Sequence, residues 1–73
     1  MDVQPTRADE AYRRVTQRFA AAKREFAVLE AAHRRGDRDS RQETRTLEAI
    51  ASVRDATQTF RRVVAEEHHL HTT

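Results

Sequence analysis

Two stretches of the sequence have the spacing of a metal-binding helix. Glu30 and His33, and likewise Glu66 and His69, stand three residues apart, the Glu-x-x-His spacing with which helical bundles hold carboxylate-bridged metal pairs. A full site of that kind needs more carboxylates and imidazoles converging in the middle of a bundle, and the sequence adds only Glu43 near His33. We therefore expect no metal site, and an ordinary pairing of His33 with Glu30 or Glu43.

The histidine-rich stretch EEHHLHTT is a second candidate for metal chemistry. His68 and His71 would share a helix face, and histidine pairs of that kind bind Zn²⁺ or Ni²⁺ readily in vitro. The ends of a helix fray, however, and a frayed segment holds metal ligands poorly. We expect no physiological cofactor at this stretch.

Catalytic chemistry has less support in the sequence than metal binding. The chain has no cysteine and one glycine, so it lacks a thiol nucleophile and a glycine-rich loop that holds a phosphate. No serine, histidine and aspartate are placed to converge in a concave site. We expect a protein that is not an enzyme and takes no small-molecule substrate.

Basic residues offer a different chemistry, the binding of phosphate groups. The chain has 14 lysines and arginines against 12 acidic residues. The candidate contacts for an anionic partner are those without an acid at helical spacing: Arg18, Lys23, Arg24, Arg54 and Arg61. In a hairpin they form a loose belt at mid-length. The RNA-binding protein ROP has a comparable two-hairpin architecture but shares no motif with this chain, so nucleic-acid binding is the alternative function.

Two long helices must position all of these residues. In the first half of the chain, apolar positions recur in steps of four and three, which is typical of a packed helix face. They are Ala8, Tyr12, Val15, Phe19, Ala22, Phe26, Leu29 and His33. Thr6 is placed to cap this helix, with Asp9 completing a capping box. The sequence predicts a helix over about 7–35.

A second helix is predicted over about 41–70, with a capping box from Ser40 to Glu43. Its main apolar line is Thr46, Ile50, Val53, Thr57, Phe60, Val64, Glu67 and His71, and the line beside it is Ala49, Val53, Ala56, Phe60, Val63, Glu67 and Leu70. Gly36 lies where a left-handed residue would end the first helix, so residues 36–40 are predicted to form a bend. Arg35-Gly36-Asp37 is interpreted as part of this bend and not as an adhesion tripeptide.

The fold class is therefore all-α, an antiparallel two-helix hairpin in one domain over residues 1–73, with 1–5 and 71–73 expected to fray. The main apolar lines of the two helices should form the intramolecular seam, which leaves the line beside it on the second helix as an outer flank. A hairpin this small has no enclosed core, and domains of its size seldom fold without a staple or a partner. Two hairpins that pack their flanks would make a four-helix bundle, so we expect a homodimer.

The residues expected in the assembly share apolar character and helical spacing. They are Tyr12, Val15, Phe19, Phe26, Leu29, Leu47, Ile50, Val53, Phe60, Val63, Val64 and Leu70, with Val63 and Leu70 at the outer contact. The predicted function is that of an interaction module: an adaptor, regulator or chaperone-like subunit that binds itself or another helical protein. The chain has no apolar run long enough to span a bilayer and no secretory-signal layout, so we expect a cytoplasmic protein without a membrane partner.

Overall fold

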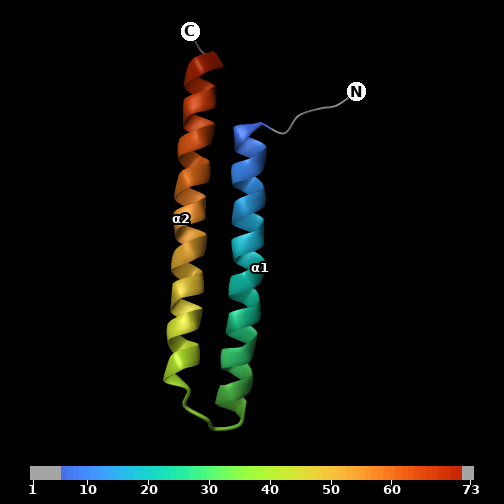
Figure 1. Cartoon of the computed structure of the whole chain (residues 1–73), viewed down its shortest axis with the longest axis vertical. Helices are drawn as coiled ribbons and strands as arrows, with labels where there is room; N and C mark the ends of the chain where they lie inside the picture. The colour runs from blue at the N-terminus through green and yellow to red at the C-terminus, as the bar shows by residue number, and fades with distance from the viewer. Residues whose placement is uncertain (1–5, 72–73) are drawn as a thin grey trace, which may run out of the picture.

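The computed structural model of the chain is a hairpin of two long α-helices that lie side by side (Figure 1). It describes the backbone of residues 6–71 and the side chains of residues 6–68. Helix α1 spans Arg7–Arg34 and helix α2 spans Ser40–His71. The all-α hairpin and its bend are confirmed, and each helix boundary lies within one residue of its predicted position. The predicted fraying at 1–5 and 72–73 and the side chain of Leu70 lie outside the described residues, whereas the backbone of His71, also predicted to fray, lies in the last turn of α2.

Helix α1 is capped at both ends by residues that adjoin it in the sequence. At its start the Thr6 side chain accepts a hydrogen bond from the Asp9 amide (3.1 Å), and the Asp9 carboxylate accepts one from the Thr6 amide (3.2 Å). At its end the Gly36 amide donates to the His33 carbonyl and the Asp37 amide to the Ala32 carbonyl, each at 3.0 Å. These two bonds form a Schellman motif, which needs the left-handed backbone that Gly36 adopts at a φ of 76°.

Helix α2 begins with a different cap from the predicted one. The carboxylate of Asp39 accepts hydrogen bonds from the amides of Arg41 (3.1 Å) and Gln42 (3.2 Å). Asp39 is therefore the N-cap, Ser40 is the first helical residue, and the predicted Ser40 cap is wrong by one position. A carboxylate also interacts more favourably than a hydroxyl with the positive end of the helix dipole.

The seam between the helices is lined by small side chains. Its buried residues come from both helices: Ala11, Ala22 and Ala32 of α1, and Gln42, Thr46, Ala56 and Val63 of α2. Val15 and Leu29 of α1, and Ala49, Val53 and Phe60 of α2, are half-buried in the same seam. Small side chains let the two backbones approach closely.

This seam corrects the predicted one. Tyr12, Phe19, Phe26, Ile50 and Val64, which were expected inside the hairpin, are exposed. The line that was expected to be the outer flank of α2, including Ala56 and Val63, is the one that packs against α1. On α1 the observed and predicted lines share Ala8, Val15, Ala22 and Leu29, and both have heptad spacing. Relative to the predicted face, the face of each helix that packs in the seam is thus rotated about the helix axis by part of a turn, toward the smaller side chains.

A polar cluster lies in the seam, toward the end of the hairpin that carries the turn. The Gln42 amide donates to the carbonyl and to the carboxylate of Glu25, at 3.0 Å and 2.7 Å. The Thr46 hydroxyl lies beside them and donates to the Gln42 carbonyl at 2.8 Å. At the other end of the hairpin the Ala8 amide donates to the Glu67 carboxylate (3.3 Å). Polar contacts therefore fix the register of the seam near both ends. In the described residues no helical stretch is apolar enough to cross a membrane.

Candidate interaction surface

Large apolar side chains gather on one side of the hairpin, outside its seam. Seven large hydrophobic side chains are exposed among those that the structure describes, and six of them share this side. We name these six the aromatic face: Tyr12, Phe19 and Phe26 of α1, with Leu47, Ile50 and Val64 of α2. The seventh, Val28, is 52% exposed and lies on the other side of α1.

Helix geometry explains why these residues lie together. Tyr12, Phe19 and Phe26 recur every seven residues, so they form one row along α1 beside its seam. Phe26 and Ile50 line one shallow groove of about 320 Å³ that runs between the helices. The ring of Tyr12 packs against that of Phe60 with centroids 5.7 Å apart. Both helices thus contribute apolar side chains to the same side of the hairpin.

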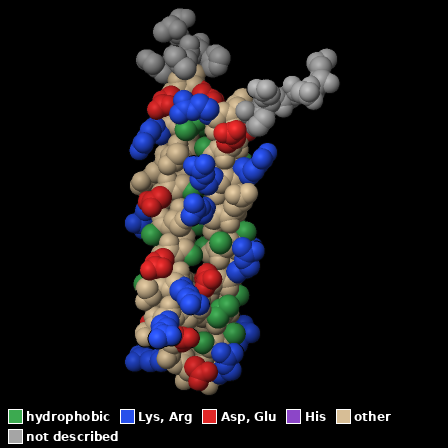
Figure 2. Space-filling model, viewed as in Figure 1, with side chains coloured by type: hydrophobic (Ala, Val, Ile, Leu, Met, Phe, Trp, Pro, Cys, Tyr) green, Lys and Arg blue, Asp and Glu red, His purple; other side chains and the backbone are tan. Residues whose placement is uncertain are grey.

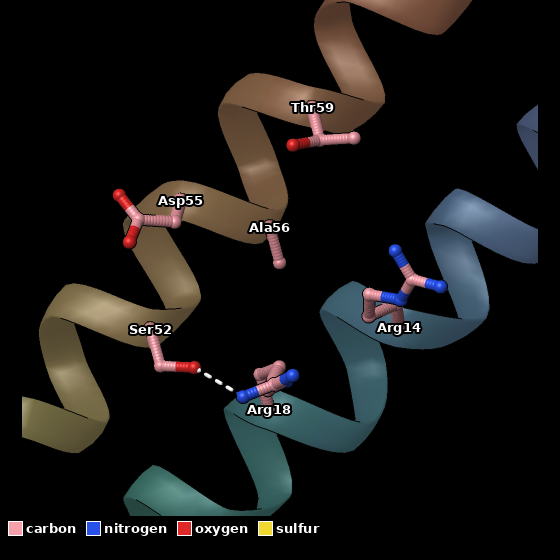
Figure 3. Close-up of a pocket in the computed structure, with 6 residues that line it drawn as sticks. All are labelled: Arg14, Arg18, Ser52, Asp55, Ala56 and Thr59. Carbon is pink, nitrogen blue, oxygen red and sulfur yellow. Dashed lines mark hydrogen bonds between the residues drawn. The ribbon is translucent and has the colours of Figure 1, made fainter.

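The opposite side of the seam is polar. There Arg14 and Arg18 of α1 and Ser52, Asp55 and Thr59 of α2 line a small pocket (Figure 3). The guanidinium of Arg18 donates a hydrogen bond to the Ser52 hydroxyl at 2.7 Å, the dashed line in Figure 3. On the face of the molecule that Figure 2 presents, basic, acidic and hydrophobic side chains are interspersed along both helices. A mixed surface of this kind is typical of a solvated face.

The five cations proposed to contact an anionic partner do not form one surface. Arg18 bonds to Ser52 on the polar side, whereas Lys23 lies over the ring of Phe19, 5.9 Å from its centroid. By helical spacing Arg54 and Arg61 border the aromatic face along α2, and Arg24 points away from it on α1. Ion pairs in the described part of the chain involve other arginines, namely Arg7, Arg34 and Arg35.

The residues with metal-ligand spacing have other partners or stand apart. The Glu30 carboxylate accepts a hydrogen bond from the guanidinium of Arg34 at 3.1 Å, and Glu66 pairs with Arg7 at 3.5 Å. His33 is exposed at the edge of a groove with Phe26 and Glu30. Among the described residues, no three His, Cys, Asp or Glu side chains are close enough to hold an ion. The side chain of His69 lies outside the described residues.

The sequence-predicted assembly residues fall into two groups in the structure. Those of the aromatic face are exposed and available to another molecule. Five others are used inside the hairpin, fully or in part, namely Val15, Leu29, Val53, Phe60 and Val63, and the side chain of the twelfth, Leu70, lies outside the described residues. Ala11 and Ala32 of the seam, and Gln42 and Glu25 of the polar cluster, were missed, whereas Ala22 and Thr46 stood on the predicted seam lines. For the alanines a signal existed, because Ala11, Ala22 and Ala32 follow heptad spacing.

Comparison with known proteins adds nothing to this geometry: no family model, curated protein or solved structure matches the chain.

Proposed function

We propose that this chain is a non-enzymatic protein–protein interaction module that works by packing its aromatic face against another helical surface, that of a second copy in the first instance. In this role it would serve as an adaptor, regulator or chaperone-like subunit. The observation that carries the proposal is the gathering of six of the seven large exposed apolar side chains, among those described, on one side of the hairpin. A contiguous apolar surface of this kind marks an interaction site.

The area of the molecule supports the same proposal. The accessible surface of the chain is 6417 Å², whereas a compact monomer of this length exposes roughly 4,700 Å². The radius of gyration is 16.9 Å, against about 11 Å for a compact domain of the same length. The hairpin therefore leaves roughly 1,700 Å² more surface in water than a compact fold would. A partner that covers the aromatic face removes much of that excess.

The pattern along each helix is that of a bundle and not of an isolated pair. A two-stranded coiled coil needs two apolar positions in seven, whereas a helix in a four-helix bundle needs three. On α1 the seam and the row of Tyr12, Phe19 and Phe26 together supply the third position. On α2, Ile50 and Val64 supply the third apolar position. A four-helix bundle made of two hairpins would use all of these residues.

The proposal is tested by replacing an exposed residue on each side of α1. Phe26 and Val28 are 55% and 52% exposed, so Phe26→Ser and Val28→Ser remove apolar side chains that are about equally exposed to solvent in the single hairpin. Burial of two phenylalanines per dimer is worth about 3 to 6 kcal/mol. Phe26→Ser should thus weaken self-association at least about 100-fold, and Val28→Ser should leave it unchanged.

Sedimentation over a dilution series measures this effect. Equal association of both variants, or a wild-type mass that stays monomeric at every concentration, would remove the proposed function in its self-associating form. The alternative, nucleic-acid binding through Arg18, Lys23, Arg24, Arg54 and Arg61, makes a separate prediction. Phosphate contacts weaken steeply as salt rises, whereas an apolar interface changes little. Salt-sensitive binding of the chain to RNA or DNA that Phe26→Ser leaves intact would favour that alternative.

A further inference from the structure

We infer that the aromatic face is covered by a second copy of the chain, related by a two-fold axis parallel to the helices, so that both turns lie at the same end of a four-helix bundle. The inference rests on the proposed function and adds the arrangement of the two hairpins. It is carried by the uncovered area, by the levels at which residues of α1 and α2 meet, and by the charges that border the aromatic face.

The uncovered area is large enough for a second copy. A standard protein interface takes about 800 Å² from each partner. The hairpin exposes 6417 Å², an excess of roughly 1,700 Å² over a compact monomer. One hairpin laid along the aromatic face would therefore bury a standard area and leave the polar side, with Arg18 and Ser52, in water.

The border of the aromatic face is defined by helical spacing. The residues that border the aromatic face are Asp9, Thr16, Lys23 and Glu30 on α1, and on α2 they are Arg54, Arg61 and His68, which continue the heptad row of Leu47. All of them are exposed in the single hairpin. In a four-helix bundle these positions stand between a helix of one hairpin and the neighbouring helix of the other. Their charges therefore select among the arrangements of the two copies.

The level of each border residue, meaning its height along the long axis of the hairpin, follows from contacts across the seam. Tyr12 lies level with Phe60, and Arg18 lies level with Ser52. A two-fold axis parallel to the helices keeps every level, so α1 of one copy lies beside α2 of the other in the same register. Asp9 then stands beside Arg61 of the second copy.

The remaining border pairs of this arrangement are also compatible. Thr16 falls beside Arg54 of the second copy, and the aliphatic stem of Lys23 falls beside its Leu47. The aromatic rows interdigitate as well, because Phe19 falls between the levels of Thr57 and Ile50 of the second copy.

The arrangement with turns at opposite ends is less compatible. An axis perpendicular to the helices through Phe19 would place α1 beside α1 and α2 beside α2. Asp9 would then lie beside Glu30 of the second copy, and Arg54 would lie within about one helical turn of the same arginine of the second copy. Both bring like charges close together, which disfavours an interface. Charge complementarity therefore selects the arrangement with both turns at one end.

Spin labels in the turn measure the arrangement directly. The chain has no cysteine, so Arg38→Cys gives a single labelling site in an exposed position of the turn. With both turns at one end, the two labels should be within about 25 Å, the width of two helices side by side. With turns at opposite ends the separation would be about 55 Å, since each turn lies nearly twenty residues from Phe19 at 1.5 Å per residue.

Disulfide formation provides an independent readout. Thr16→Cys chains mixed with Arg54→Cys chains should form a heterodimeric disulfide, because these positions meet only between copies and a disulfide needs Cα atoms within about 7 Å. Arg54→Cys alone should stay reduced. If Arg54→Cys instead links to itself, or the labels at position 38 lie about 55 Å apart in a dimer, the inference is wrong while the proposed function stands. A chain that never dimerises overturns the inference together with the self-associating form of the proposed function.

Discussion

The buried amide of Gln42 is the most constrained polar group that the structure describes in the seam. It occupies a position where an alanine or valine would ordinarily pack, and its two N–H bonds are satisfied by Glu25 of the other helix. Because Glu25 uses both its backbone carbonyl and its carboxylate, a shift of the helices by one residue would break both bonds. The cluster thus fixes the register of the hairpin, a role that buried polar groups have in coiled coils.

We expect Gln42→Ala to lower the free energy of unfolding by about 1 to 3 kcal/mol, because the Glu25 carbonyl loses a buried hydrogen bond. Gln58 lies on the same helix and is exposed, so Gln58→Ala is the matched control and should change stability by less than about 0.5 kcal/mol. Urea unfolding at a fixed protein concentration measures both. Equal stability of the two variants would show that the cluster does not hold the seam.

Single residues differ in how well the sequence predicts them. The turn at Gly36 was predictable, since a lone glycine between two helical patterns has few other uses. The capping box of Thr6 and Asp9 was predictable for the same local reason. The Gln42 cluster was not, because a polar residue at a seam position is indistinguishable in sequence from one that faces water.

At the scale of the helix, the boundaries of α1 and α2 were predicted to within one residue while the packed face was not. Local capping chemistry decides where a helix begins and ends. Which face packs depends on the neighbour, and two adjacent lines on α1 both had heptad spacing. Side-chain size, which permits close approach along Ala11, Ala22 and Ala32, chose between them. Spacing alone carries no information on that choice.

The small-residue seam predicts a strong asymmetry between two alanines of α2. Ala56 is 7% exposed in the seam, whereas Ala51 is exposed on the outer side. Ala56→Leu should force the helices apart and lower the free energy of unfolding by about 1 to 3 kcal/mol. Ala51→Leu should leave it nearly unchanged, because both residues favour helix. Thermal and urea unfolding test the pair, and an Ala56→Leu variant as stable as wild type would contradict the observed seam.

At the scale of the whole molecule, the hairpin has too little interior to be a compact fold. The structure describes no side chain of large volume as fully buried. The stability of a molecule that gains most of its apolar burial from a partner depends on the concentration of that partner. In the proposed dimer the free energy of unfolding therefore depends on protein concentration as well as on the sequence of the chain.

We expect the midpoint of thermal unfolding to rise as the protein is concentrated, because association draws the equilibrium toward the folded state. Phe26→Ser should remove this dependence, and Val28→Ser should keep it. Circular dichroism melts over a hundredfold range of concentration measure the effect. A wild-type midpoint that is independent of concentration would contradict self-association at this scale.

The residues of the candidate surface were predictable, although their place in the fold was not. Tyr12, Phe19, Phe26, Ile50 and Val64 were named for assembly from sequence alone, because apolar residues at helical spacing pack against something. The sequence could not say whether that surface belongs to the same chain or to another molecule. The alanines decided it by occupying the intramolecular contact themselves.

The alanine-lined seam has a consequence for how such a protein diverges. Helix α1 packs on its own second helix through one heptad line, and the proposed contact with other molecules uses the adjacent line, which shares only Ala8, Val15, Ala22 and Leu29 with the first. In the proposed function, mutations at Phe19 would change which partner the hairpin binds and would spare the seam. Sequences that diverge from this chain could thus change their binding partner and keep the same helical hairpin.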